Sequence, residues 1–118
     1  MTGGRRSGGG QRREAGPPRW QDPELDEAAL AVARRTRDVI ETLGQLGQHR
    51  WVAFLEPLVP AFEDGDRVDL QMAARRARAA FGARGSLLDA GVAAQALPLR
   101  DAVDRLLLLL DRRRALGA

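Results

Sequence analysis

The sequence predicts an all-α protein: a compact bundle of about five short helices behind a disordered basic N-terminal arm. Apolar residues recur at helical spacing through most of residues 22–118, which is the main indication of amphipathic helices. The first 21 residues contain almost nothing apolar and cannot form a core of their own. A chain of 118 residues also suits one domain. We therefore expect a disordered Arg/Gly/Pro-rich arm at 1–21 and a single helical domain at 22–118.

The positive charge of the chain is concentrated in the arm. All 19 basic side chains are arginines, and the absence of lysine, tyrosine and cysteine raises the isoelectric point to about 11.1 without a large charge surplus. Residues 1–21 hold five arginines against one glutamate, whereas residues 22–118 hold 14 arginines against 15 acids. A basic arm can bind phosphate backbones without sequence preference, although it can also be a solvated leader. The arginines of the arm are Arg5, Arg6, Arg12, Arg13 and Arg19.

The chain shows no membrane or export signal. Its longest strongly apolar run, Leu106 to Leu110, is far too short to span a bilayer. The N-terminal arginines are not followed by the apolar segment of a secretory signal. We expect a cytoplasmic protein with no membrane partner.

The first helix is expected to begin at Asp22. Asp22 is a candidate N-cap, Pro23 suits the first helical position, and Gly44 and Gly47 are placed to close the helix. The predicted apolar face is Leu25, Ala28, Ala29, Val32, Thr36, Val39, Ile40, Leu43 and Leu46.

A second helix is predicted over residues 48–62. Pro57 and Pro60 interrupt it on the side opposite its apolar stripe, so we expect either a bent helix or two shorter pieces. The stripe is Trp51, Phe54, Leu55, Leu58 and Phe62.

The third helix is predicted over residues 68–81. We interpret Asp66 and Asp69 as an acidic cap of this helix, because the acidic cluster around Gly65 lacks the spacing of a calcium-binding loop. The predicted apolar face is Leu70, Ala73, Ala74, Ala77, Ala80 and Phe81.

The joint after this helix, residues 81–89, is the most distinctive stretch of the sequence. Gly82 stands where a left-handed residue often closes a helix. Ser86 is a candidate N-cap with Asp89 as its capping-box partner. Gly85 and Arg84 beside a helix start could hold an anion or a partner's carboxylate, although turn geometry and an N-cap are enough to explain this stretch.

A short fourth helix is predicted over residues 87–96, and Pro98 is expected to break it and start the last helix. In that last helix Leu99, Val103, Leu106 and Leu110 form the inner face. Leu108 falls on the polar side, which suggests a surface covered by a partner or a second copy.

The residues available for catalysis are few. His49 is the only histidine, and no Ser/His/Asp set, paired carboxylates or phosphate-binding loop is apparent. We expect no enzyme activity, no cofactor and no metal site.

Five residues of the joint also form part of a recognisable pattern. With Trp51 upstream, the positions Phe81, Gly82, Gly85, Ser86 and Asp89 resemble a small uncharacterised bacterial family of all-helical domains with a Phe-Gly-Gly-Met-Gly-Ser-type motif. Ala83 and Arg84 replace the Gly-Met pair of that motif. The resemblance covers roughly residues 25–112 and implies a short helical fold, but no known activity.

Together these features predict a non-enzymatic helical protein that acts through protein–protein interaction, as a regulatory or immunity-type module. The alternative is a nucleic-acid-binding accessory protein that uses the basic arm. The candidate interaction or structural motif is Trp51, Phe81, Gly82, Arg84, Gly85, Ser86, Asp89 and Leu108.

Overall fold

A computed structural model describes residues 17–82 and 86–117, and every regular element within these ranges is helical. The predicted all-α fold is confirmed. The described residues form five α-helices and three short 3-10 turns; η2 precedes α1, η3 joins α2 to α3, and η4 lies between α4 and α5. In chain order the elements are η2 Arg19–Gln21, α1 Pro23–Gln45, α2 His49–Leu55, η3 Glu56–Leu58, α3 Val59–Asp64, α4 Arg67–Ala79, η4 Leu87–Ala90 and α5 Ala93–Gly117.

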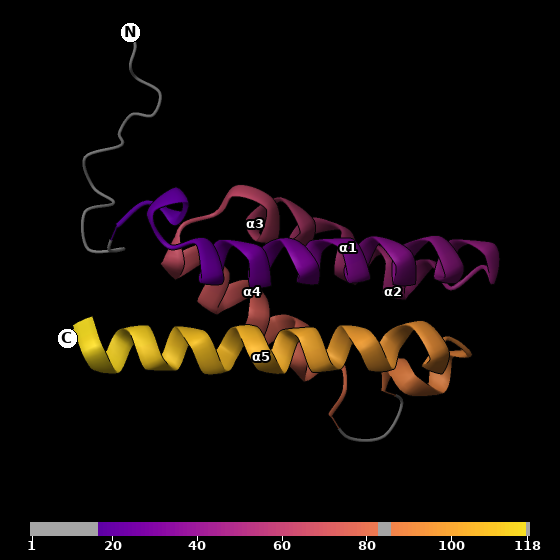
Figure 1. Cartoon of the computed structure of the whole chain (residues 1–118). Helices are drawn as coiled ribbons and strands as arrows, with labels where there is room; N and C mark the ends of the chain where they lie inside the picture. The colour runs from indigo at the N-terminus through magenta and orange to yellow at the C-terminus, as the bar shows by residue number, and fades with distance from the viewer. Residues whose placement is uncertain (1–16, 83–85, 118) are drawn as a thin grey trace, which may run out of the picture.

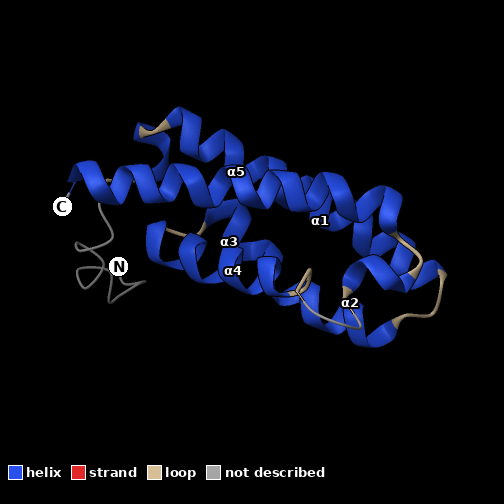
Figure 2. Cartoon of the chain, turned by 90° about the horizontal axis from the view of Figure 1, so that it is seen from below, coloured by secondary structure: helices blue, strands red, loops and turns tan. Residues whose placement is uncertain are grey.

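The two long helices, α1 and α5, lie side by side and antiparallel, with the shorter helices behind them (Figure 1). At one end of the pair Arg113 of α5 bonds Asp22 at the start of α1. At the other end Gln48, just after α1, bonds the Ala90 carbonyl just before α5. Seen from below, α4 runs beside α5 (Figure 2), and an Arg78–Asp104 ion pair joins the two helices.

Helix α1 begins and ends as predicted. The Asp22 carboxylate accepts a hydrogen bond from the Leu25 amide, and Pro23 is the first helical residue. At the other end Gly47 adopts φ 72°, while the amides of Gly47 and Gln48 donate to the carbonyls of Gly44 and Leu43. This is the Schellman arrangement, which satisfies the last carbonyls of the helix and turns the chain toward α2.

Of the two forms expected for residues 48–62, a bent helix or two shorter pieces, the structure has the second, because the 3-10 turn η3 divides the segment into α2 and α3. Pro57 and Pro60 are both exposed, on the side away from buried Leu55, Leu58 and Phe62. The prolines therefore break the hydrogen-bond ladder without removing the inward stripe from the core.

The turn before α4 is tightly packed. Asp66 and Asp69 form a reciprocal capping box, as expected from the sequence. Gly65 is buried, and a Cβ added to it would lie 2.7 Å from the Ala61 carbonyl oxygen and 2.7 Å from the Asp69 Cβ. This position requires glycine because neighbouring atoms lie too close for a Cβ, and not because its φ is positive.

The prediction of a separate helix over residues 87–96 is wrong. Residues 87–90 form only a 3-10 turn, and Gly91, with φ 86°, ends it. Pro98 neither breaks nor starts a helix, because it lies inside the continuous α5. It lies in the second turn, where the missing amide leaves only the carbonyl of exposed Ala94 without its intrahelical donor.

The core is formed almost entirely by aliphatic side chains from the predicted faces. Thr36 is the buried polar residue, and its hydroxyl donates to the Val32 carbonyl oxygen at 2.7 Å. Leu46, expected on the apolar face of the first helix, is instead 53% exposed, because α1 ends before it. The largest fully buried side chains are Phe62, Leu25, Leu43, Leu55, Leu70, Leu87, Leu99, Leu106, Val32, Val39, Val92 and Val103.

Residues 17–21, which were expected within the disordered arm, belong to the described structure, and three of them form η2. The arginines at 5, 6, 12 and 13 lie outside the described residues.

Within residues 17–82 and 86–117, no helix has the length and apolar character needed to cross a bilayer.

Candidate functional site

An aromatic groove lies between α2 and the end of α4, and we take it as the candidate site. Its cavity volume is about 470 Å³. Trp51 and Phe54 form one wall as an edge-to-face pair, with ring centroids 5.8 Å apart and planes at 85°. Both side chains are partly accessible, and Phe54 is 38% exposed. The groove is lined by Gln48, Arg50, Trp51, Phe54, Ala79 and Ala80.

The local sequence explains why the groove is open. Trp51 and Phe54 are three residues apart on α2, so they occupy one side of that helix. The facing positions on α4 are Ala79 and Ala80, whose methyl groups cannot fill the space beside two aromatic rings. Large side chains on one helix and small ones on the other leave apolar surface that nothing in the described residues covers.

The polar residues of the groove differ in how they are held. Gln48 is anchored, because its Nε2 donates to the Ala90 carbonyl oxygen at 3.3 Å. Arg50 is exposed, and no ion pair holds its guanidinium within residues 17–82 and 86–117. Arg50 therefore gives the rim of the groove a positive charge.

The structure brings part of the predicted motif to this groove. Trp51 lines it, and Phe81 and Gly82 directly follow its Ala80 wall. Phe81 is half-buried against the core. Arg84 and Gly85 lie outside the described residues, so the anion-site hypothesis built on them stays a prediction.

The remaining motif residues have local roles or lie elsewhere. Ser86 caps η4 by accepting from the Leu88 amide, as predicted. Asp89 is exposed, and within the described chain the reciprocal capping bond is made by Asp66 and Asp69, not by this pair. Leu108 is 52% exposed on α5, away from the residues that line the groove.

The expected left-handed conformation at Gly82 is wrong. Among the described residues the positive-φ glycines are Gly47 and Gly91. The chain leaves α4 through successive 3-10 type bonds, in which the amides of Phe81 and Gly82 donate to the carbonyls of Arg78 and Ala79. Right-handed turns therefore close this helix.

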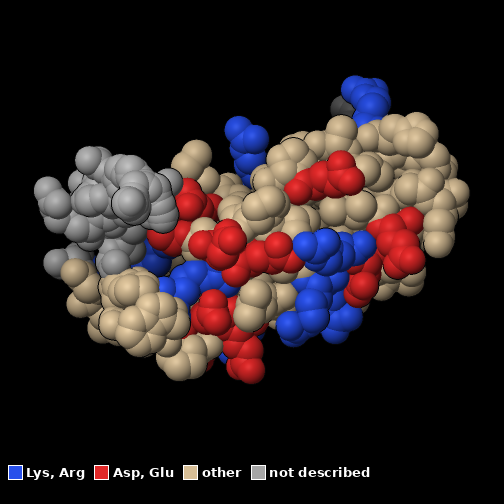
Figure 3. Space-filling model, turned by 90° about the horizontal axis from the view of Figure 1, so that it is seen from above, with Lys and Arg blue, Asp and Glu red and all other residues tan. Residues whose placement is uncertain are grey.

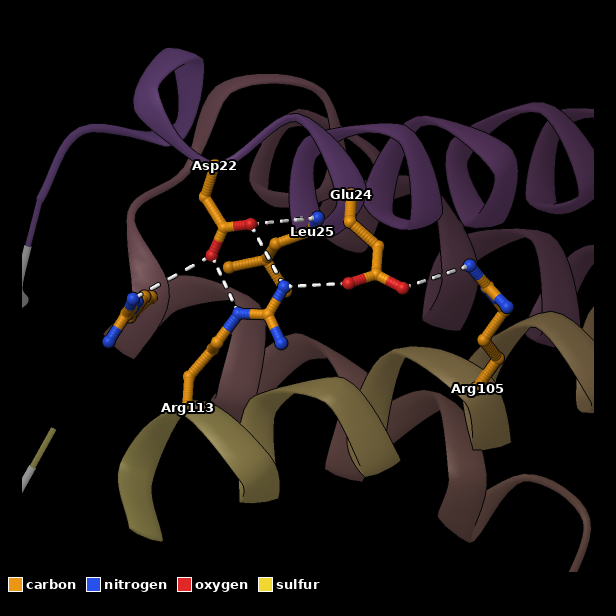
Figure 4. Close-up of polar contacts among 6 residues, drawn as sticks. Asp22, Glu24, Leu25, Arg105 and Arg113 are labelled. Atoms are coloured by element: carbon orange, nitrogen blue, oxygen red, sulfur yellow. Dashed lines mark hydrogen bonds and ion pairs between the residues drawn. The ribbon is translucent and has the colours of Figure 1, made fainter. Parts of the chain in front are cut away.

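The opposite end of the bundle holds a network of ion pairs around Asp22 (Figure 4). Arg113 approaches Asp22 with two nitrogens, at 2.8 and 3.0 Å, and also donates to Glu24 at 2.9 Å. Arg67 and Arg105 add longer ion pairs, to Asp22 at 3.7 Å and to Glu24 at 3.8 Å. The Arg113 hydrogen bonds hold the pKa of Asp22 below its usual value, outweighing the opposing effect of burial. The same contacts raise the pKa of Arg113.

Arg19 forms a second anchor at this end. Its side chain is only 8% exposed, and its Nε donates to Asp26 of α1 at 2.9 Å. Its two terminal nitrogens donate to the carbonyl oxygens of Ala61, Gly65 and Phe62, at 3.3, 3.2 and 2.8 Å. The guanidinium therefore caps the carboxyl end of α3 and ties it to α1. The sequence-based grouping of Arg19 with the nucleic-acid-binding arginines is corrected by these contacts.

The other described residues considered for catalysis or metal binding are not gathered into one site. His49 is the exposed first residue of α2. In residues 17–82 and 86–117 no three His, Cys, Asp or Glu side chains are grouped so that they could hold a metal ion. Acidic and basic side chains are interspersed on the face seen from above (Figure 3).

Comparison with protein-family models, with curated proteins and with solved structures finds no match to this chain.

Proposed function

We propose that this protein is a small, non-enzymatic interaction module that binds a protein partner through the aromatic groove. The observation that carries the proposal is the partly exposed Trp51–Phe54 pair facing Ala79 and Ala80. Aromatic residues in an open apolar pocket are typical of binding hot spots, because one inserted side chain buries much area. A regulatory or immunity-type binder would use such a surface.

The charge of the rim specifies the partner's chemistry. Arg50 lines the groove and its side chain is exposed. A partner segment with a leucine or aromatic anchor flanked by carboxylates would complement both the apolar walls and the basic rim. We infer that the groove binds an acidic segment with one large apolar side chain.

Peptide selection tests this proposal directly. A phage-displayed library of random peptides would be selected on the immobilised full-length chain. Enriched peptides should share an apolar anchor beside Asp or Glu. They should bind the Phe54→Ser and Arg50→Glu variants at least about tenfold more weakly, the loss expected for a hot-spot contact.

Val68→Ser supplies the matched control, because Val68 is an exposed apolar residue at the far end of α4. Binding to this variant should equal wild type. Failure to enrich any peptide family, or equal binding to all three variants, would overturn the proposal.

Nucleic-acid binding by the arm is the second candidate, and charge segregation favours it. Residues 1–16 carry four arginines against one glutamate, whereas the described residues 17–82 and 86–117 carry 14 arginines against 15 acids. Replacing Arg5, Arg6, Arg12 and Arg13 with serine in the full chain should abolish any salt-dependent affinity for duplex or single-stranded oligonucleotides. Unchanged affinity would exclude the arm as the binding element. Arg19 is kept in this variant, because its guanidinium holds α3.

A further inference from the structure

A second surface, separate from the groove, is formed by the outward sides of α4 and α5. Val68 and Met72 on α4 are 47% and 60% exposed, and Leu108 on α5 is 52% exposed. The two helices run beside one another on the face seen in Figure 2. Neither helix has a further described helix outside it to cover these side chains.

The ion pairs between the helices fix their register. Arg78 Nε lies 2.8 Å from Asp104 Oδ1, while Arg67 and Arg113 meet on Asp22 at the other end. The two helices are therefore antiparallel. At 1.5 Å per residue, Met72 lies about 9 Å and Leu108 about 6 Å from the Arg78–Asp104 level, both toward Asp22. The two exposed apolar side chains are thus nearly level on adjacent helices.

The charges around this apolar centre are opposite on the two helices. Arg75 and Arg76 of α4 are exposed and have no ion-pair partner in the described ranges. The outward side of α5 carries Asp104 and Asp111, whose pairs with Arg78 and Arg114 are themselves 42 to 64% exposed. Such exposed pairs are weak and readily exchange partners. The acidic stripe is the side of α5 nearer α4, and Arg105 and Arg112 border Leu108 on its other side.

We propose that this surface, centred on Met72 and Leu108, binds a second copy of the same chain. A two-fold axis parallel to the helices places α4 of each copy on α5 of the other. Met72 of one copy then lies against Leu108 of its partner, and the basic side of α4 meets the acidic side of α5 twice. A surface with an apolar centre and opposite charges on its two halves is complementary to itself under this operation.

Self-association is measured by sedimentation velocity on the full-length chain over a range of concentrations. The wild type should show a concentration-dependent dimer. Leu108→Glu should remain monomeric at every concentration tested, whereas Leu116→Glu, at the most exposed leucine of α5, should dimerise like wild type. Circular dichroism checks that each variant keeps its helical fold.

Charge reversal distinguishes this arrangement from any other dimer. The double variants Arg75→Glu/Arg76→Glu and Asp104→Arg/Asp111→Arg should each be monomeric alone. An equimolar mixture should recover the dimer, because each α4 then meets an α5 of opposite charge at both contacts. A monomeric wild type, dimers that survive Leu108→Glu, or a mixture that stays monomeric would each overturn the proposal.

Discussion

The two ends of the α1–α5 pair are built in opposite ways. At the end where α1 begins, Arg19 and Arg113 reach across the chain and satisfy carboxylates and helix-terminal carbonyls of several elements. At the end where α1 stops, the only side-chain hydrogen bond recorded between elements in the described chain is that from Gln48 to Ala90. That second end has the Trp51–Phe54 pair, both partly accessible, along one wall of the groove.

We therefore expect one end of the pair to contribute mainly to stability and the other end mainly to binding. Partly buried polar contacts hold the chain at one end, so substitutions there should lower the free energy of unfolding. At the other end Trp51 and Phe54 line a groove and make no such polar contact, so substitutions there should change binding and leave the fold intact.

Arg19→Ala should be the most destabilising change. It removes three hydrogen bonds to carbonyls at the end of α3 and the ion pair with Asp26. Since the side chain is nearly buried, we expect a loss of about 3 kcal/mol in the free energy of unfolding. Urea unfolding followed by circular dichroism measures it. Arg19→Lys keeps the charge but not the fork of donors, and should recover less than half of the loss.

Asp22→Ala should cost about 2 kcal/mol, because it removes both the α1 cap and the ion pairs with Arg113 and Arg67. Asp22→Asn keeps a good capping side chain and loses only the charge, so it should cost about 1 kcal/mol. Thermal unfolding of the two variants separates the contributions. Equal losses in the two variants would mean that the cap contributes nothing, and no loss in Asp22→Asn would mean that the ion pairs contribute nothing.

The pH dependence of stability should change in the same variants. The pKa of Asp22 is lowered in the folded state, so the carboxylate stabilises the protein at pH above its ordinary value of about 3.9. That contribution is lost as the pH falls through the lowered pKa of the folded state. Wild type should therefore lose stability more steeply in acid than Asp22→Asn, and parallel profiles would contradict this assignment.

Gly65→Ala should destabilise by about 1–2 kcal/mol, since its Cβ would lie 2.7 Å from a backbone oxygen. Gly44→Ala, near the end of α1 that is closer to the groove, is the control. Gly44 lies in α1 with no other atom within 4 Å of an added Cβ, so alanine should stabilise by about 0.5–1 kcal/mol. Differential scanning calorimetry of both variants checks the signs, and two losses would contradict the packing argument.

Arg50→Glu should be nearly neutral for folding, within about 0.5 kcal/mol, because Arg50 is exposed. Its effect should appear only in peptide binding. A loss of stability comparable to that of Asp22→Ala would show that the groove end is also held by polar contacts.

The sequence predicted those parts of the fold that depend on local chemistry. The cap at Asp22, the turn at Gly47 and the capping box at Asp66 were all expected, because each is specified within four or five residues. Pro98 was misjudged, since its tolerance depends on how far it lies from the start of α5. The pattern could not reveal that Gly91, rather than Gly82, would take the left-handed turn.

The candidate site was only partly predictable. Trp51 was singled out, and Phe54 belonged to the expected apolar stripe. That Ala79 and Ala80 lie opposite them depends on how the tertiary fold brings the end of α4 near α2, which periodicity does not report. Arg19 was assigned to the arm for the same reason, since its partners lie up to 46 residues away. The resemblance to the Phe-Gly-Gly-Met-Gly-Ser-type family stays a prediction.

The most direct test of the division between the two ends is a fluorescence titration of a selected acidic peptide into the Trp20→Phe variant. Trp51 is then the only tryptophan, and it lines the groove. We predict a saturable change in emission that is weakened at least about tenfold by adding Arg50→Glu and is unaffected by adding Asp22→Asn, under conditions where both proteins are folded. A titration that is weakened by Asp22→Asn but not by Arg50→Glu would contradict the account.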